Sequence, residues 1–242
     1  MLVETIERKR FGPLTLLLKR CGPEAHFLER REPSADTGDP APTDWVRWII
    51  DEHSGDLKFV PALPNRSVVV RPEAEIHVPP GESALFFVSI PLWVQVQLAD
   101  KTGKSLFETP VVVLSNIWFG DTMSGELCYS LTTRARTSLG SVPEDAHQAI
   151  CPVRVKNGSK EPLEFSRLCV RAPHLRLYAT ERHMWTEQVE VKYLGEAEGS
   201  EVTYQGKPPA YEEGCKLLAK ARESREAVLF LRSFNYLKAL AG

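Results

Sequence analysis

The stretch at residues 111–136 indicates two strands joined by a turn, and no other feature limits the fold as strongly. Residues 111–119 are nearly all apolar and β-branched or aromatic, as in a strand buried on both faces, whereas residues 126–136 alternate apolar and polar side chains. Successive side chains of a strand face opposite ways, so Leu127, Tyr129 and Leu131 share one face. The turn at residues 120–125 begins and ends with glycine, which tolerates the positive φ angles of tight turns. The sequence therefore predicts a β-hairpin that buries Leu127, Tyr129 and Leu131.

Similar strand signals recur along much of the chain. Short apolar or alternating runs are separated by Gly, Pro, Asn and Asp, and no helical periodicity lies between them up to about residue 204. The pair Asn157-Gly158 is the strongest short hairpin signal, because it favours a type I′ turn. Strands joined by turns without helices are typical of antiparallel sheets. We therefore expect a mainly β fold, an antiparallel β-sandwich or a barrel-like meander.

The chain changes character near its C-terminus. Residues 211–239 contain no proline, and Leu and Ala recur there at helical spacing among charged residues. Pro209 suits the first turn of a helix. We therefore expect residues 207–242 to form a C-terminal α-helical segment packed on a β-rich domain of residues 1–206, which could divide near 100–105. The alternative is that this helix binds a partner protein or a membrane surface instead of its own domain.

The charge balance argues against nucleic acid as a partner. The chain has 30 Lys and Arg against 32 Asp and Glu, which gives a formal net charge of −2 at pH 7. Domains that bind nucleic acid usually carry a basic patch. The basic residues between 134 and 182 mostly alternate with apolar neighbours, as on the solvated face of a strand. We therefore expect no nucleic-acid partner.

The cysteines and the N-terminal region bear on the cellular compartment. Five cysteines are scattered without a CxxC pair, so the usual spacing of a structural zinc site is missing. Free thiols are typical of a reducing compartment. The apolar run at residues 14–18 is too short for a signal peptide, and no stretch has membrane-spanning length. We expect a cytoplasmic protein with free thiols and no transmembrane segment.

Familiar catalytic motifs are missing from the sequence. It contains no GxSxG, no HExxH, no P-loop and no GxGxxG that opens a helix. The six histidines have no metal-ligand spacing on one local element. We therefore expect no catalytic residue, no cofactor and no metal site. Whether the protein is an enzyme stays open, and the missing motifs favour a protein that is not one.

The polar residues that are the strongest candidates for a binding site lie in and beside the hairpin turn. Asp121, Ser124 and Glu126 lie near Trp118, and Arg134 follows on the outgoing strand. Polar loop tips on a rigid sheet often bind ligands. In the simpler interpretation, Asp121 and Ser124 hold the turn through bonds to nearby backbone amides.

A family resemblance rests on the same segment. Residues 119–129, FGDTMSGELCY, resemble the central motif of the largely archaeal domain of unknown function 432 family: an aromatic residue, Gly-Asp-Pro-x-Ser-Gly, then an apolar run with Cys and an aromatic residue. Thr122 stands where the motif has Pro, which leaves the turn less rigid. The runs PALP at 61–64 and VRVKN at 153–157 fit as well, and the resemblance covers about residues 57–204. It implies no known activity, but it does imply a cytoplasmic accessory role beside a small mechanosensitive channel.

Two functions remain open from the sequence. In the first, the chain is a non-catalytic binding or regulatory β-module that acts through a protein partner, which the resemblance suggests is a membrane channel. Its contact would be the hairpin tip or the C-terminal helix. In the second, it is an enzyme or small-ligand binder with a polar pocket around Asp121, Ser124, Glu126 and Arg134. Convergence of these side chains beside a concave pocket would favour the second.

Overall fold

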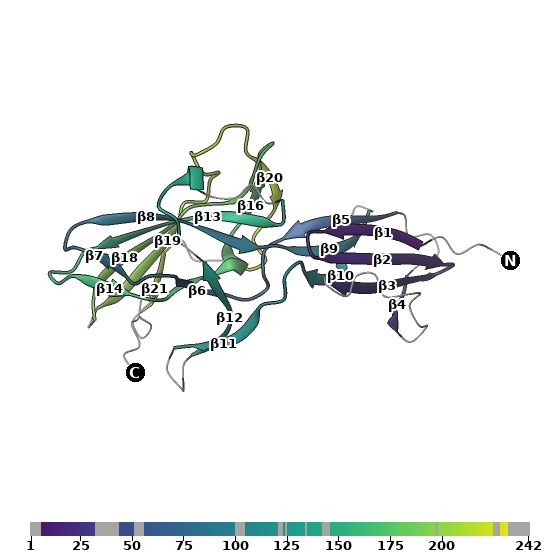
Figure 1. Cartoon of the computed structure of the whole chain (residues 1–242), viewed down its shortest axis with the longest axis horizontal. Coiled ribbons are helices and arrows are strands. Elements are labelled where there is room, and N and C mark those ends of the chain that lie inside the picture. Colours follow the sequence, from purple (N-terminus) through teal and green to yellow (C-terminus); the bar gives the residue numbers. More distant parts are fainter. Residues whose placement is uncertain are drawn as a thin grey trace. The chain divides into compact units, whose positions relative to one another are not determined.

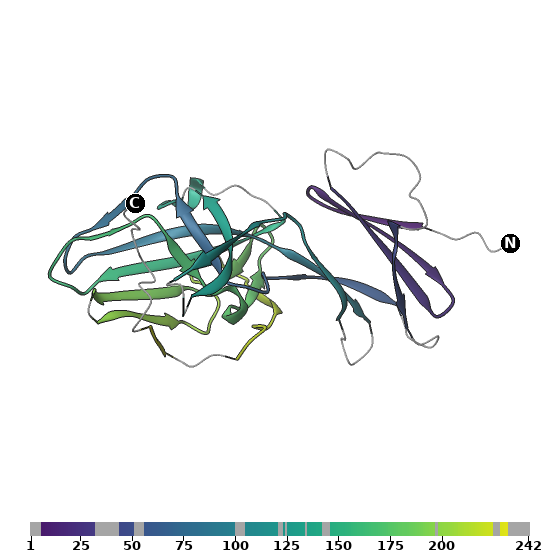
Figure 2. The same ribbon diagram turned by 90° about the horizontal axis from the view of Figure 1, so that it is seen from below.

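Nearly every regular element that the structure, a computed structural model, describes is a β-strand (Figure 1 and Figure 2). By the pattern of contacts, the chain divides into two compact units. Unit 1 comprises Met1–Ala62 and Trp93–Val112, and unit 2 comprises Leu63–Leu92 and Val113–Gly242. The structure describes residues 6–31, 44–50, 56–99, 105–120, 123, 125–133, 135–141, 146–196, 198–224 and 228–231.

Unit 1 is a sandwich of two antiparallel sheets. The first sheet has the order β1 (Ile6–Phe11), β2 (Leu14–Cys21), β3 (Glu24–Arg31) and β4 (Val46–Ile49). The second has the order β10 (Ser105–Pro110), β9 (Trp93–Leu98) and β5 (Leu57–Ala62). Leu16 of β2 and Val96 of β9 are buried in one core between the sheets. The rings of Phe27 and Phe107 stack across that core with their centroids 5.3 Å apart.

Unit 2 contains the predicted hairpin and the larger sheets. Its four-stranded sheet has the order β11 (Ser115–Phe119), β12 (Glu126–Thr133), β6 (Val68–Pro72) and β15 (Leu168–Val170). Its eight-stranded sheet has the order β20 (Lys216–Ala219), β16 (Leu177–Ala179), β17 (Met184–Thr186), β13 (Gln148–Asn157), β18 (Val189–Gly195), β19 (Gly199–Tyr204) and β21 (Val228–Leu231), with β8 (Ser83–Pro91) paired to β13. A small sheet pairs β14 (Leu163–Phe165) with β7 (Ile76–Val78). The described residues of this unit also form two short 3₁₀ turns, η2 (Leu139–Ser141) and η3 (Ala172–His174).

Strands of both larger sheets contribute to one main core in unit 2. Val69 of β6 and Val153 and Val155 of β13 are fully buried within it. The other face of β13 directs Ile150 into a second cluster around Trp185, because successive side chains alternate between faces. The prediction of a mainly β fold built from antiparallel sheets, as in a sandwich or a barrel-like meander, is confirmed. Parallel pairs also occur, between β12 and β6 and between β13 and both β17 and β18.

The pair Asn157-Gly158 does not form the predicted two-residue hairpin. The strand that follows, β14, pairs with β7 and not with β13. The fully buried Asn157 amide donates hydrogen bonds to the carbonyl oxygens of Val78, at 2.9 Å, and Glu161, at 2.8 Å. The prediction is wrong because this side chain holds β7 and the next loop in place, a role that the local turn preference does not reveal.

The C-terminal helix predicted for residues 207–242 is wrong for the part of that segment that the structure describes. Residues 216–219 form β20, which pairs with β16, and residues 228–231 form β21, which pairs with β19. Both add to open edges of the eight-stranded sheet, where backbone hydrogen bonds outweigh a weak helix preference. Residues 225–227 and 232–242 lie outside the described residues. No helix among the described residues is long and apolar enough to cross a membrane.

Candidate functional site

The register of the β11–β12 hairpin decides which side chains share a face. Trp118 lies opposite Leu127, and Phe119 lies opposite Glu126. Directly opposed residues of two paired strands point to the same side of the sheet. The hairpin therefore presents Trp118 and Leu127 on one face, with Phe119, Glu126 and Cys128 on the other. Phe119 and Cys128 are buried, so the second face is turned towards the core.

The outer face of this hairpin is apolar and exposed. Trp118 is 51% exposed and Leu127 is 45% exposed, while Met123 in the turn is 94% exposed. We call Trp118, Met123 and Leu127 the hairpin-tip patch. Further along β12, Tyr129 and Leu131 are half-buried against the core. The prediction that Leu127 is buried is wrong, because Cys128 and not Leu127 occupies the core-facing position.

A loop covers the outer face of β12 beyond Leu127. The Tyr129 hydroxyl donates a hydrogen bond to Asn65 Oδ1 at 2.8 Å. The guanidinium of Arg66 lies over the Tyr129 ring, 5.6 Å from its centroid. Residues 63–67 therefore shield Tyr129 but leave the hairpin-tip patch open to solvent.

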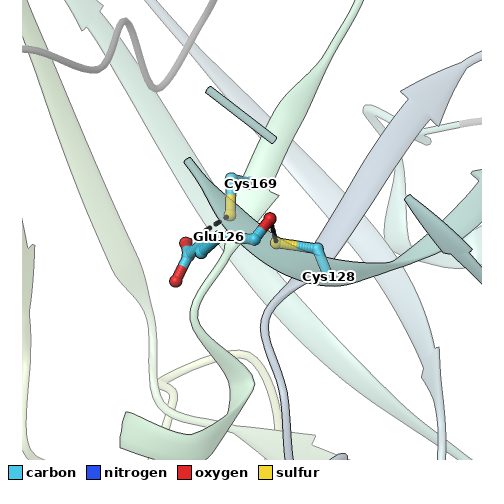
Figure 3. A group of neighbouring side chains, drawn as sticks. All are labelled: Glu126, Cys128 and Cys169. Carbon is cyan, nitrogen blue, oxygen red and sulfur yellow. Dashed lines mark hydrogen bonds between the residues drawn. The ribbon is translucent and has the colours of Figure 1, made fainter. Parts of the chain in front are cut away.

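On the inner face of the hairpin, the thiol of Cys169 from β15 lies beside the Cys128 thiol and the Glu126 carboxylate of β12 (Figure 3). The Cys169 thiol donates to Glu126 Oε1 at 3.8 Å, and the Cys128 thiol donates to the Glu126 carbonyl oxygen at 3.7 Å. The ligand atoms of Glu126, Cys128 and Cys169 all lie within 4.8 Å of one another. We call these three residues the Glu126–Cys cluster. Arg171 lies beside it, with Nη2 3.3 Å from Glu126 Oε1 and Nη1 3.4 Å from Oε2.

The cluster forms because β6 lies between two strands that are distant in the sequence. On one side of β6, Tyr129 of β12 is opposite Val68, and on the other side Cys169 of β15 is opposite Val69. Counting along these registers places Cys128 and Cys169 on the same face of the sheet. Both cysteines are fully buried, whereas the Glu126 side chain keeps 34% exposure. The carboxylate therefore forms the solvent side of the cluster.

The surroundings of Cys169 favour its neutral form. A hydrogen bond with Cys128 and burial in the core raise the pKa of the Cys169 thiol well above its ordinary value of 9.0. The Arg171 guanidinium acts in the opposite direction, since a nearby positive charge lowers the pKa of a thiol. Without a bound cation, Cys169 is a neutral thiol at pH 7.

The predicted site residues do not form one cluster among the described residues. Trp118 and Glu126 lie on opposite faces of the hairpin, so the fold does not bring them together. Glu126 faces Arg171 and the two thiols. Asp121, Ser124 and Arg134 lie outside the described residues.

Sequence reasoning missed Cys169, Arg171 and the exposed Met123 as parts of a site. Alternation along β12 did put Glu126 and Cys128 on one face, but it could not show that this face is the buried one. Cys169 lies 43 positions from Glu126 along the chain, and no local spacing rule links the two. The sequence signal of this cluster is the alternation of polar and sulfur-containing residues on two strands. It can be interpreted once the order of the strands in the sheet is known.

Two further polar features lie in unit 2. Glu212 accepts hydrogen bonds from Trp185 Nε1 at 2.7 Å and from His183 Nδ1 at 3.0 Å. A pocket of about 670 Å³ opens beside β16 and β20. Its lining residues are Arg176, Tyr178, Leu217, Lys220, Ala221, Glu223 and Ser224. None of them belongs to the predicted site.

The chain was also compared with known proteins. Comparisons with curated proteins and with solved structures gave no match. A family model does match, over residues 3–238, and this confirms the resemblance seen in the hairpin motif. Since the match spans nearly the whole sequence, the chain belongs to the family described as protein of unknown function (DUF432).

Proposed function

We propose that this protein is a non-catalytic binding module that holds a protein partner through the hairpin-tip patch. The observation that carries the proposal is the opposed pair Trp118 and Leu127, which expose 51% and 45% of their surface. Large apolar side chains kept in water at a loop tip are a common mark of an interaction surface. Tryptophan is enriched among the residues that dominate binding energy, because one rigid side chain buries a large area.

The partner that fits this patch has an apolar groove or pocket able to receive an indole ring. We further propose a cytoplasmic location and a membrane channel as the partner, following the resemblance of the hairpin motif. A channel partner would be recovered with the membrane fraction of a lysate, whereas a second copy of this chain would be seen as a dimer in sedimentation.

An enzyme or small-ligand site around Asp121, Ser124, Glu126 and Arg134 is the other candidate. Of these four residues the structure describes Glu126, and its carboxylate is engaged by Arg171 and Cys169. No contact among the described residues favours this candidate over binding through the tip, and we do not adopt it.

The test is a pull-down from detergent-solubilised membranes and from the soluble fraction. The double variant Trp118→Ser/Leu127→Ser is compared with Val46→Ser/Ile49→Ser, which removes two exposed apolar side chains from β4 in unit 1. We expect one identified protein to be captured by the wild type and by the β4 control. The tip variant should bind it at least about tenfold more weakly, since a residue of this kind contributes about 1.4 kcal/mol or more. Equal capture by both variants contradicts the proposal.

A further inference from the structure

We propose that Glu126, Cys128 and Cys169 form a binding site for a zinc-type divalent cation at the base of the hairpin. Their ligand atoms lie within 4.8 Å of one another. Ligands around a tetrahedral zinc ion, with Zn–S of about 2.3 Å and Zn–O of about 2.1 Å, are separated from each other by roughly 3.3–3.8 Å. The three atoms therefore need to move inwards by only about 1 Å or less.

The donor set favours zinc over the hard cations. Two thiolates and one carboxylate suit a borderline-soft metal, whereas Mg²⁺ and Ca²⁺ select sites made of oxygen alone. Binding displaces the two thiol protons, and each thiolate then contributes a negative charge. Those charges offset the ion, while Arg171 offsets the carboxylate charge from 3.3 Å away. The bound site is then close to neutral, as a largely buried site has to be.

The position of the cluster gives the ion a route from solvent and a second layer of support. The Glu126 side chain is 34% exposed and forms the open side, whereas both thiols are closed off from solvent. Arg171 reaches both carboxylate oxygens, at 3.3 Å and 3.4 Å, and so orients the oxygen ligand. Outer groups that orient a ligand in this way usually raise metal affinity.

The strand order disfavours a disulfide as the other use of these thiols. Cys128 and Cys169 lie on β12 and β15, which are separated by β6. Two strand spacings place their Cα atoms roughly 9 Å apart, beyond the reach of about 7 Å that a disulfide bridges without backbone movement. A metal ion fills the gap between the sulfurs that a covalent bond cannot.

Bound metal would connect β12 to β15 across β6. The site shares β12 with the hairpin-tip patch but lies on the opposite face, since Leu127 and Cys128 are consecutive. The ion therefore does not touch a partner at the tip. It fixes the base from which the tip projects, and this inference stands whether or not the tip binds a protein.

The test uses the full chain, purified in reductant without chelators and loaded with Zn²⁺ or Co²⁺. Native mass spectrometry should show one Zn²⁺ per chain. Co²⁺ should produce the near-ultraviolet absorption band of thiolate-to-cobalt charge transfer, and Zn²⁺ should remove it. Wild-type protein that takes up no Zn²⁺ and gives no thiolate band overturns the proposal without any variant.

Variants then locate the site. Cys128→Ser/Cys169→Ser should lose the thiolate band, and Glu126→Gln, which changes a partly exposed side chain, should weaken Co²⁺ binding at least tenfold. The matched control is Cys151→Ser, because Cys151 is equally buried in unit 2 but lies outside the cluster. It should keep the wild-type band. An unchanged band in the double cysteine variant, or unchanged affinity in Glu126→Gln, places the metal elsewhere and overturns the assignment.

Discussion

Glu212 keeps its negative charge although it is partly buried beside Trp185 and His183. Trp185, which donates to its carboxylate, stacks on Tyr211 with ring centroids 6.0 Å apart. Burial on its own would raise the pKa of Glu212, but the hydrogen bonds from Trp185 and His183 outweigh it and hold the pKa below its ordinary value of 4.5. The carboxylate therefore fastens the segment after β19 to the cluster around Trp185.

This lowered pKa predicts how stability depends on pH. A carboxyl group whose pKa is lower in the folded chain than in the unfolded chain stabilises the fold above the unfolded value. We expect Glu212→Gln to be less stable than the wild type above pH 4.5. The difference should shrink as the pH falls through the lowered pKa. Denaturant titrations between about pH 3 and pH 7 measure it. A difference that stays constant over this range, or that widens towards acid, contradicts the prediction.

At the scale of elements, the two faces of the β11–β12 hairpin differ in burial. The apolar side chains on the outer face of β12 are partly shielded by the loop at residues 63–67 up to Tyr129, and Leu127 lies beyond that shield. The inner face carries Cys128, which packs with β6 and β15 in the main core. The stability of this sheet therefore depends more on the inner face than on the outer face near the tip, where Trp118 and Leu127 remain exposed.

A pair of leucine substitutions tests this division. Leu168 on β15 is 2% exposed and Leu127 is 45% exposed. We expect Leu168→Ala to lower the free energy of unfolding by about 2–5 kcal/mol, because it leaves a cavity in the core. Leu127→Ala should cost about 1 kcal/mol at most, because half of its surface is already in water. Chemical denaturation compares the two. Equal losses of unfolding free energy would contradict the division between the two faces, because they would show that Leu127 is buried, as the alternation alone predicts.

The existence of this hairpin was predictable because its signals are local. Alternation along residues 126–133 and the glycines at 120 and 125 are short-range features, and the strands follow them. The choice of buried face was not local, since it depends on β6 and β15, which come from distant parts of the chain. The same reason explains why the helix predicted near the C-terminus is wrong. Residues 216–219 have an acceptable helix composition, but they pair with the edge of β16 that faces away from β17.

At the scale of the whole molecule, the chain crosses between its two units more than once. Unit 1 takes residues from both sides of the segment Leu63–Leu92, and unit 2 takes residues from both sides of Trp93–Val112. Composition does not change at these crossings, because both units are built from the same kind of strand. The β class of the fold could therefore be predicted from the sequence, whereas the interleaved assembly and the Glu126–Cys cluster required strand pairing.

Photo-crosslinking at the hairpin tip tests the proposed binding function most directly. A photoreactive amino acid replaces Met123, which is 94% exposed, and in a separate protein it replaces Ile49, which is 75% exposed on β4 of unit 1. Both are irradiated in cells that produce the full chain. We expect a covalent adduct with one defined protein from position 123 that is not formed from position 49. No adduct from position 123, or the same adducts from both positions, contradicts it.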